Sequence, residues 1–181
     1  RYEPEGKNVL LLNMNELDSV LEFFEIDNSP QNLEGMLFQD DPPAGGLTAE
    51  HIYVRFSSAI YNRWDYDEQT GRYLRYVDTQ NAYSRDQEKY DLLTDQLTGN
   101  AISADSVVIL MAKNFAIAQN IYDIKLTGRG KAFVARNGTI YDVYWVREQP
   151  EDLLSFTGQD GSPFPLKPGQ TWFEVMSDPT N

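Results

Sequence analysis

The sequence predicts an α+β fold that is predominantly antiparallel β, either a hairpin-rich sheet or a partly open barrel, with one N-terminal amphipathic helix. Three observations lead to this class. Apolar residues recur with a helical period in one segment near the N-terminus, and they alternate with period two in several segments beyond residue 50. Glycine-containing turns separate those later segments. Helices and strands do not alternate along the chain, which argues against a parallel βαβ sheet.

Residues 15–26 form the segment with the helical period. Its apolar side chains fall on one helix face: Leu17, Val20, Leu21 and Phe24. Acidic and hydroxyl side chains cover the opposite face. Asn15 can cap the first turn, Asp18 favours the positive helix end, and Pro30 lies beyond the point where the helix has to stop.

Residues 39–46, Gln-Asp-Asp-Pro-Pro-Ala-Gly-Gly, contain two prolines and two glycines. This composition is incompatible with regular structure. We interpret the segment as a linker loop that separates residues 1–38 from a mainly β domain over residues 47–178.

Turn chemistry and periodicity predict the strands of that domain. Residues 52–56 alternate apolar and polar side chains, and residues 67–71 end in glycine, as a hairpin turn does. Asn137-Gly138 is the strongest hairpin signal in the chain. Residues 106–111 are almost continuously apolar, which indicates a strand buried on both faces. Further strands are expected at residues 122–126, 131–136 and 171–176.

Composition excludes several classes of function. The chain has 181 residues and a formal net charge of −13, which repels nucleic-acid phosphates and anionic lipid headgroups. It has no cysteine and one histidine, which rules out thiol nucleophiles, iron–sulfur sites and histidine-rich metal centres. The longest apolar stretch, Val107–Ala112, is too short to span a bilayer. We therefore expect no metal, no cofactor, no nucleic-acid partner and no direct membrane insertion by this chain.

No catalytic residue can be assigned from the sequence. His51, after Glu50, is either a general base oriented by a carboxylate or a solvated residue at the entry of a strand. Residues 65–71 resemble a calcium loop superficially, but glycine is their seventh residue and not their sixth, so a hairpin turn accounts for them better. A carboxylate pair for glycoside hydrolysis cannot be picked out among 28 acidic residues.

Aromatic residues crowd the hairpin around residues 67–71. Trp64 and Tyr66 share one face by period two, and Tyr73 on the returning strand can pair across from them. If that face is exposed, these rings with Asp65 and Arg75 suit a sugar ring or an extended peptide. If it is buried, they are core, which is the more frequent role of such residues. These five are the candidate binding residues, and burial of more than about nine-tenths would exclude an aromatic from a surface.

A series of short motifs runs through the chain in a fixed order. It consists of Asn28–Met36, Phe38, Pro42–Gly46, Tyr53–Phe56, the string W-x-Y-D-x-x-T-G-x-Y-x-R from Trp64 to Arg75, Leu97–Gly99, Asp105–Val108, Leu126–Gly130 and Leu166–Trp172. Each motif alone is weak, but their joint order is specific. From about Asn28 to Val175 the chain resembles the YerB-like family of bacterial lipoproteins, a two-domain extracytoplasmic family of unknown function.

This resemblance implies a lipid anchor and a first domain upstream of the region seen here. Residues 1–38 would then be the C-terminal remnant of that preceding α/β-type domain, and residues 47–178 the complete second domain. The resemblance places the protein outside the cytoplasm, on the bacterial cell surface or secreted. It supplies no catalytic residues.

Three functions from different classes remain open. The first is a non-catalytic cell-envelope module that recognises a protein partner or a cell-wall glycan through the candidate hairpin, or through strand addition at a sheet edge. The second is a hydrolase or transferase that acts on cell-wall polymers. It needs a cleft with two carboxylates roughly 5–9 Å apart and a raised pKa, and the sequence shows no nucleophile motif. The third is a structural subunit of an extracellular assembly. The sequence does not determine the oligomeric state.

Overall fold

The computed structural model describes residues 13–28, 35–119 and 121–178. It divides the chain into two compact units, residues 1–32 and 33–181. Residues 39–46 contain neither helix nor strand, but they belong to the second unit, and the backbone at their start is hydrogen-bonded within it. Gln39 N donates to Leu166 O over 3.0 Å, and the buried guanidinium of Arg136 donates to the carbonyls of Gln39 and Asp40. That residues 1–38 come from a preceding domain stays a prediction.

The first unit contains the predicted helix in a shorter form. A 3-10 turn, η1 (Met14–Glu16), leads into helix α1 (Leu17–Phe23). The side chain of Asn13, and not the predicted cap Asn15, accepts a hydrogen bond at this end, from Asn15 N over 3.2 Å. That bond lies at the start of the 3-10 turn, and α1 itself begins without a side-chain cap. No helix among the described residues is long and apolar enough to cross a membrane.

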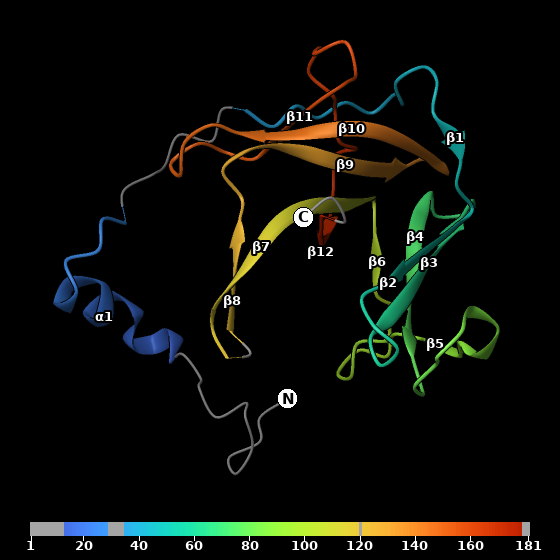
Figure 1. Cartoon of the computed structure of the whole chain (residues 1–181), viewed down its shortest axis with the longest axis horizontal. Coiled ribbons are helices and arrows are strands. Elements are labelled where there is room, and N and C mark those ends of the chain that lie inside the picture. Colours follow the sequence, from blue (N-terminus) through green and yellow to red (C-terminus); the bar gives the residue numbers. More distant parts are fainter. Residues whose placement is uncertain (1–12, 29–34, 120, 179–181) are drawn as a thin grey trace. The chain divides into compact units, whose positions relative to one another are not determined.

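The second unit consists of a seven-stranded and a five-stranded sheet (Figure 1). The bounds of the strands are β1 Leu47–Thr48, β2 His51–Arg55, β3 Tyr61–Asp67, β4 Arg72–Asp78, β5 Tyr90–Leu92, β6 Ser103–Ala104, β7 Ser106–Ala118, β8 Ile121–Lys125, β9 Gly128–Arg136, β10 Thr139–Arg147, β11 Ser155–Thr157 and β12 Thr171–Ser177. The larger sheet has the order β1-β10-β9-β7-β12, with β11 beside β10 and β8 beside β7. The smaller has the order β2-β3-β4-β5, with β6 beside β4, and a short 3-10 turn, η2 (Arg85–Gln87), precedes β5.

The α+β class with predominantly antiparallel strands is confirmed, as an open two-sheet arrangement. Among the described strands, only β7 and β12 pair in parallel. Both predicted hairpin turns are present. The Asp67 side chain accepts from Gln69 N and from the Thr70 hydroxyl, so this acidic loop is organised as a turn. Asn137 and Gly138 have φ values of 52° and 73°, the left-handed pair that a two-residue β-hairpin turn requires.

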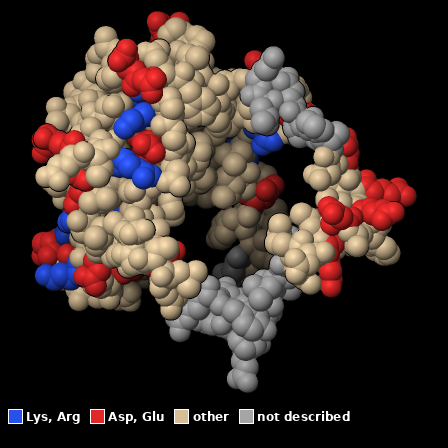
Figure 2. All heavy atoms as spheres, turned by 180° about the vertical axis from the view of Figure 1, so that it is seen from behind, with Lys and Arg blue, Asp and Glu red and all other residues tan. Residues whose placement is uncertain are grey.

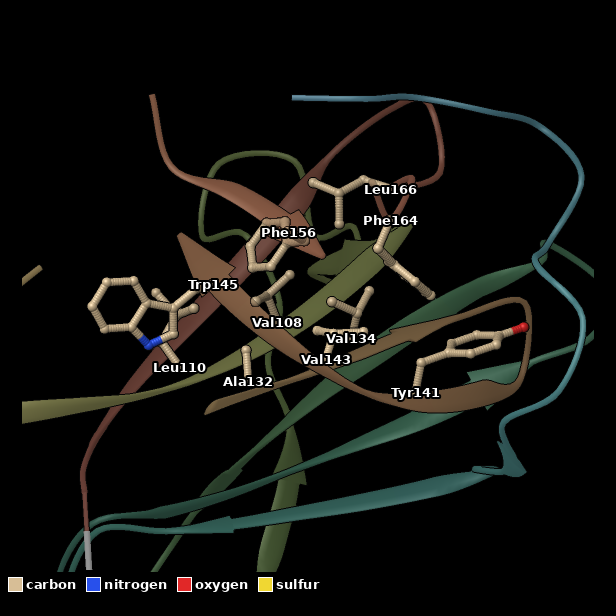
Figure 3. Close-up of a cluster of buried hydrophobic side chains, with 10 residues drawn as sticks. All are labelled: Val108, Leu110, Ala132, Val134, Tyr141, Val143, Trp145, Phe156, Phe164 and Leu166. Atoms are coloured by element: carbon tan, nitrogen blue, oxygen red, sulfur yellow. The ribbon is translucent and has the colours of Figure 1, made fainter. Parts of the chain in front are cut away.

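Strand β7 is buried on both faces over its first half, as its apolar run predicts. Val107 and Ile109 belong to the core between the two sheets, and Val108 and Leu110 belong to a second core on the other face of the larger sheet. In Figure 3, the strand residues of this second core face three side chains from the segment that leads back to β12: Phe156, Phe164 and Leu166. The larger sheet is therefore a central layer that both cores share.

The segment Gly128–Gly130, which lies between two predicted strands, is the beginning of strand β9. The reason for glycine at its end is space. A Cβ on Gly130 would lie 2.4 Å from the indole nitrogen of Trp145 on the neighbouring strand. Trp145 donates that N–H to Met111 O over 2.8 Å, which fixes the ring over the glycine. Glycine therefore admits a buried tryptophan here, and its turn-forming ability is not used.

Candidate binding surface on the five-stranded sheet

The hairpin β3–β4 places four of the five candidate residues on one face. Trp64 lies opposite Arg75, and Tyr66 lies opposite Tyr73 with ring centroids 5.1 Å apart. This face points toward the larger sheet, and Trp64 and Tyr73 are both 0% exposed. The exposed-surface hypothesis is therefore wrong for these two rings, because their bulk fills the space between the sheets. That Asp65, Tyr66 and Arg75 bind a partner stays a prediction.

Between the sheets, Arg75 meets a buried carboxyl group. Glu174 of β12 is 5% exposed and lies 3.9 Å from the Arg75 guanidinium, and Trp64 Nε1 donates to it over 3.2 Å. Arg75 also stacks on the Trp172 ring at 4.3 Å. Burial raises the pKa of Glu174 against the opposing effects of the Trp64 hydrogen bond and the Arg75 charge. Trp64 and Glu174 thus pack the interior and are closed to a large ligand.

Asp65 lies on the opposite, outer face of the same sheet. Each of its oxygens has a partner, since His51 Nδ1 lies 2.8 Å from Oδ1 and Arg63 Nη2 donates to Oδ2 over 2.8 Å. The side chain of His51 is 56% exposed. His51 thus combines features of both interpretations from the sequence. It is a solvent-exposed residue at the start of a strand, and it is also paired with a carboxylate.

Tyrosine and arginine side chains continue this outer face. The Arg63 guanidinium lies between two rings, 4.6 Å from the centroid of Tyr76 and 5.0 Å from that of Tyr90. Tyr53, 45% exposed, makes an edge contact with Tyr90 at 6.1 Å and carries the Arg85 guanidinium at 4.8 Å. Glu88 accepts from both Tyr90 and Arg55. We call the set that comprises His51, Tyr53, Arg63, Asp65, Tyr76 and Tyr90 the tyrosine–arginine face.

Most of this face was missed by the sequence analysis. Part of its signal was present in the period-two pattern, because Arg63 shares a face with Asp65 on one strand and Tyr53 shares a face with His51 on another. Only the strand register shows that they meet: Tyr53 lies opposite Arg63, and Arg63 lies opposite Tyr76.

Charges elsewhere on the surface are mixed. On the side seen in Figure 2, lysine and arginine atoms lie beside aspartate and glutamate atoms, without a broad basic area in the part of the chain that is described. No cluster of three or more metal-binding side chains occurs within the described ranges.

One pocket brings two carboxylates together. It has a volume of about 290 Å³ and is lined by Asp142 and Asp160, among others. Hydrogen bonds from the Ser162 hydroxyl and backbone lower the pKa of Asp160, whereas a general acid needs a raised one. The lowered pKa of Asp160 therefore gives no support to a carboxylate-pair hydrolase in this pocket.

The fold and this face define a two-sheet β module with a solvent-facing polar–aromatic surface. A family model described as the C-terminal domain of a protein of unknown function, DUF3048, matches residues 52–173. The chain belongs to this family, and the YerB-like resemblance is confirmed.

A solved structure, the crystal structure of YerB protein from Bacillus subtilis, is similar, with a TM-score of 0.63 and 20% sequence identity. The similarity covers 91% of this chain and 51% of that one, so the chain spans about half the length of YerB. At this identity the likeness concerns the fold. No protein of curated function matches the sequence.

Proposed function

We propose that this domain is a non-catalytic interaction module of the bacterial cell envelope, acting outside the cytoplasm, and that its tyrosine–arginine face binds a protein partner. The observation that carries the proposal is the Arg63 guanidinium held between Tyr76 and Tyr90 beside the half-exposed ring of Tyr53. The extracytoplasmic placement rests on the resemblance to YerB-like lipoproteins.

The residue types of this face are those that dominate protein–protein binding energies. Tyrosine and arginine are enriched among interface residues whose truncation costs most. Tyrosine buries a large area with few rotatable bonds, and arginine presents five hydrogen-bond donors on a planar group. Here the side chains are already held by contacts on both sides: Glu88 binds Arg55 and Tyr90, and Asp65 binds Arg63 and His51. A partner therefore has little side-chain freedom to freeze when it binds, which favours affinity.

An enzymatic role for the same face lacks a nucleophile. A histidine oriented by an aspartate is half of a hydrolytic triad, and the other ring nitrogen has to reach a hydroxyl. The hydrogen bond of His51 runs through Nδ1 to Asp65, and no serine or threonine hydroxyl in the described part of the chain is bonded to its Nε2. The His51–Asp65 pair is therefore better suited to fixing the position of neighbouring side chains such as Arg63 than to proton transfer.

Site-specific photocrosslinking tests the proposal. A benzophenone amino acid replaces Tyr53 in the full chain, and the protein is irradiated in an envelope extract. The matched control carries the same group at Tyr122 of β8, a tyrosine that is 63% exposed. We expect a discrete protein adduct from position 53 that is absent from position 122. Unlabelled wild-type protein should compete for it, and Y76A should compete at least about thirtyfold less well, as truncation of a central interface residue predicts.

Two results would overturn the proposal. One is the absence of an adduct specific to position 53. The other is an adduct that forms equally well in a protease-treated extract and is removed by enzymes that cleave cell-wall glycan, since the ligand of this face would then be a glycan.

A further inference from the structure

A concave site lies beside the two sheets, formed by residues outside the tyrosine–arginine face. A groove of about 610 Å³ is lined by residues 100–104, which end in β6, by residues 170–172 at the start of β12, and by Arg72 and Asp95. This volume lies within the range of roughly 300–1,000 Å³ that small-molecule sites have. The groove thus has the dimensions of a ligand site.

Two polar side chains of the groove are fixed before any ligand binds. Arg72 Nη2 donates to Ser103 O over 3.2 Å and to the side-chain oxygen of Gln170. Asp105 lies 3.6 Å from the same guanidinium and accepts from Gln170 N over 2.9 Å. Because the Gln170 oxygen faces Arg72, the Gln170 amide NH2 is left as a donor. Because these side chains are already fixed, they lose little conformational entropy when a ligand binds.

An acceptor lies on the other wall. Asp95 Oδ1 receives Leu97 N, Thr98 N and the Thr98 hydroxyl at 3.1, 2.7 and 2.8 Å. Those three bonds orient the carboxylate and leave Oδ2 as an acceptor. The groove therefore offers more hydrogen-bonding capacity than the protein itself uses.

The chemistry of the lining selects a neutral ligand with both polar and apolar faces. Arg72 pairs with Asp105, which also pairs with Lys167, and Asp95 adds a negative charge to the lining, so a phosphate or a polyanion gains little. Trp172 and Ile102 supply apolar wall. The Arg75 guanidinium stacks on the Trp172 ring, so a ligand packs on the part of the indole that lines the groove. A sugar ring has hydroxyls that donate and accept and a C–H face that packs on an indole. We propose that this groove binds a neutral sugar of the N-acetylhexosamine type, whose acetamide matches the carboxamides of Asn100 and Gln170.

The test uses the full chain and two probes, N,N′-diacetylchitobiose and inorganic phosphate, followed by amide and indole NMR signals. The disaccharide should shift the Trp172 indole signal, the side-chain amide of Gln170 and the backbone signals of residues 101–104 in a saturable way. Q170A removes one ligand hydrogen bond and should weaken binding about fivefold. Q159A is the matched control, since Gln159 lies outside the groove, where its side chain bonds to Asp142. If Q170A fails to fold, N100A provides the same comparison.

The outcomes separate clearly. Saturable shifts confined to the groove, weakened by Q170A and unchanged by Q159A, support the proposal. An absence of shifts at the solubility limit of the disaccharide overturns it, as do shifts that both variants retain in full. Binding of phosphate but not of the disaccharide also overturns it, because the ligand class would then be anionic. None of these results bears on the crosslinking at Tyr53.

Discussion

Glu174 is the residue at which burial and charge oppose each other most directly. Taking a carboxylate out of water costs free energy, and a cation at 3.9 Å in a buried site recovers only part of it. The raised pKa of Glu174 means that burial has the larger effect. Trp64, Arg75 and Glu174 together form a hydrogen-bonded and charged centre between the two sheets. We expect this centre to specify how the sheets align more than it stabilises them.

The Glu174→Gln substitution tests this balance through pH. Because the folded-state pKa of Glu174 lies above the ordinary value of 4.5, the native state holds its proton more tightly than the unfolded state does. Its contribution to stability is complete below about pH 4.5 and is lost as pH rises through the folded-state pKa. The variant and the wild type should therefore be similarly stable in acid. The variant should become the more stable of the two toward neutral pH, as measured by urea unfolding at several pH values.

Glu50→Gln serves as the control for that series, since residue 50 is exposed and the substitution removes the same charge. The change that Glu50→Gln makes to the free energy of unfolding should vary little across the same pH range. A Glu174 variant that loses stability relative to the wild type as pH rises would contradict the argument, because the attraction of Arg75 would then outweigh burial.

At the residue scale, the sequence predicted which side chains share a face but not which face is buried. Period two placed Trp64, Tyr66 and Tyr73 together, and the register confirms this. On each face of β4 an arginine stacks on an aromatic ring. Arg75 stacks on Trp172 on the inner face, and Arg63 stacks on Tyr76 on the outer face. Because an arginine in a core and a tyrosine on a surface are equally allowed by a polar–aromatic pattern, hydrophobicity could not orient the sheet.

At the element scale, strand β7 changes character along its length. Its first residues are buried on both faces, whereas the part that pairs with β8 is largely exposed, and all of β8 is exposed. In Figure 1 the two strands continue as a two-stranded extension beyond β9 and β10. Five large apolar side chains on this extension are between 46% and 64% exposed: Phe115, Ile117, Ile121, Tyr122 and Ile124. The extension therefore gains little from burial.

Substitutions along this hairpin should differ sharply in their effect on stability. Tyr122→Thr, in the extension, should change the free energy of unfolding by less than about 0.5 kcal/mol. Leu110→Ala, in the buried half of the same hairpin, should lower it by about 2–5 kcal/mol, since a cavity opens in a packed core. Chemical denaturation measures both values, and amide exchange should be faster in β8 than in β9. A loss above about 2 kcal/mol for Tyr122→Thr would show that this ring is packed in solution.

Elements defined by local chemistry were predicted well, and those defined by distant partners were not. The turns at residues 67–71 and 137–138 depend on their own Asp, Asn and Gly residues, so the sequence shows them directly. The two-residue strands β1 and β6 are strands only because β10 and β4 lie beside them. Likewise, nothing in residues 171–177 indicates a parallel partner at residues 106–112.

At the scale of the whole molecule, that parallel pairing joins the last strand to the middle of the chain. β12 contributes Trp172 and Met176 to the core between the sheets and Val175 to the core on the other face. Phe173 stacks on Phe156 with centroids 6.4 Å apart. A single edge strand thus completes both cores, and β7 is left with an unpaired edge if β12 is missing.

We therefore predict that a chain ending at Gln170 does not reach the cooperative native state. Two cores would be opened at once, because the partly buried side chains of Trp172, Val175 and Met176 are lost together with the backbone pairing of β12 to β7. Each of these side chains contributes less than the roughly 1.5–3 kcal/mol of a fully buried one, and their combined loss is a large fraction of the total stability of a typical domain. The truncated chain should give a broad thermal transition and poorly dispersed NMR spectra. Because the exposed edge of β7 then offers a template for strand addition, a synthetic peptide of residues 168–178 should restore a sharp transition. A peptide in which Trp172 and Val175 are replaced by serine should not. Cooperative unfolding of the truncated chain by itself would show that the seven-stranded sheet closes without β12, and that the two cores are less interdependent than their shared strand implies.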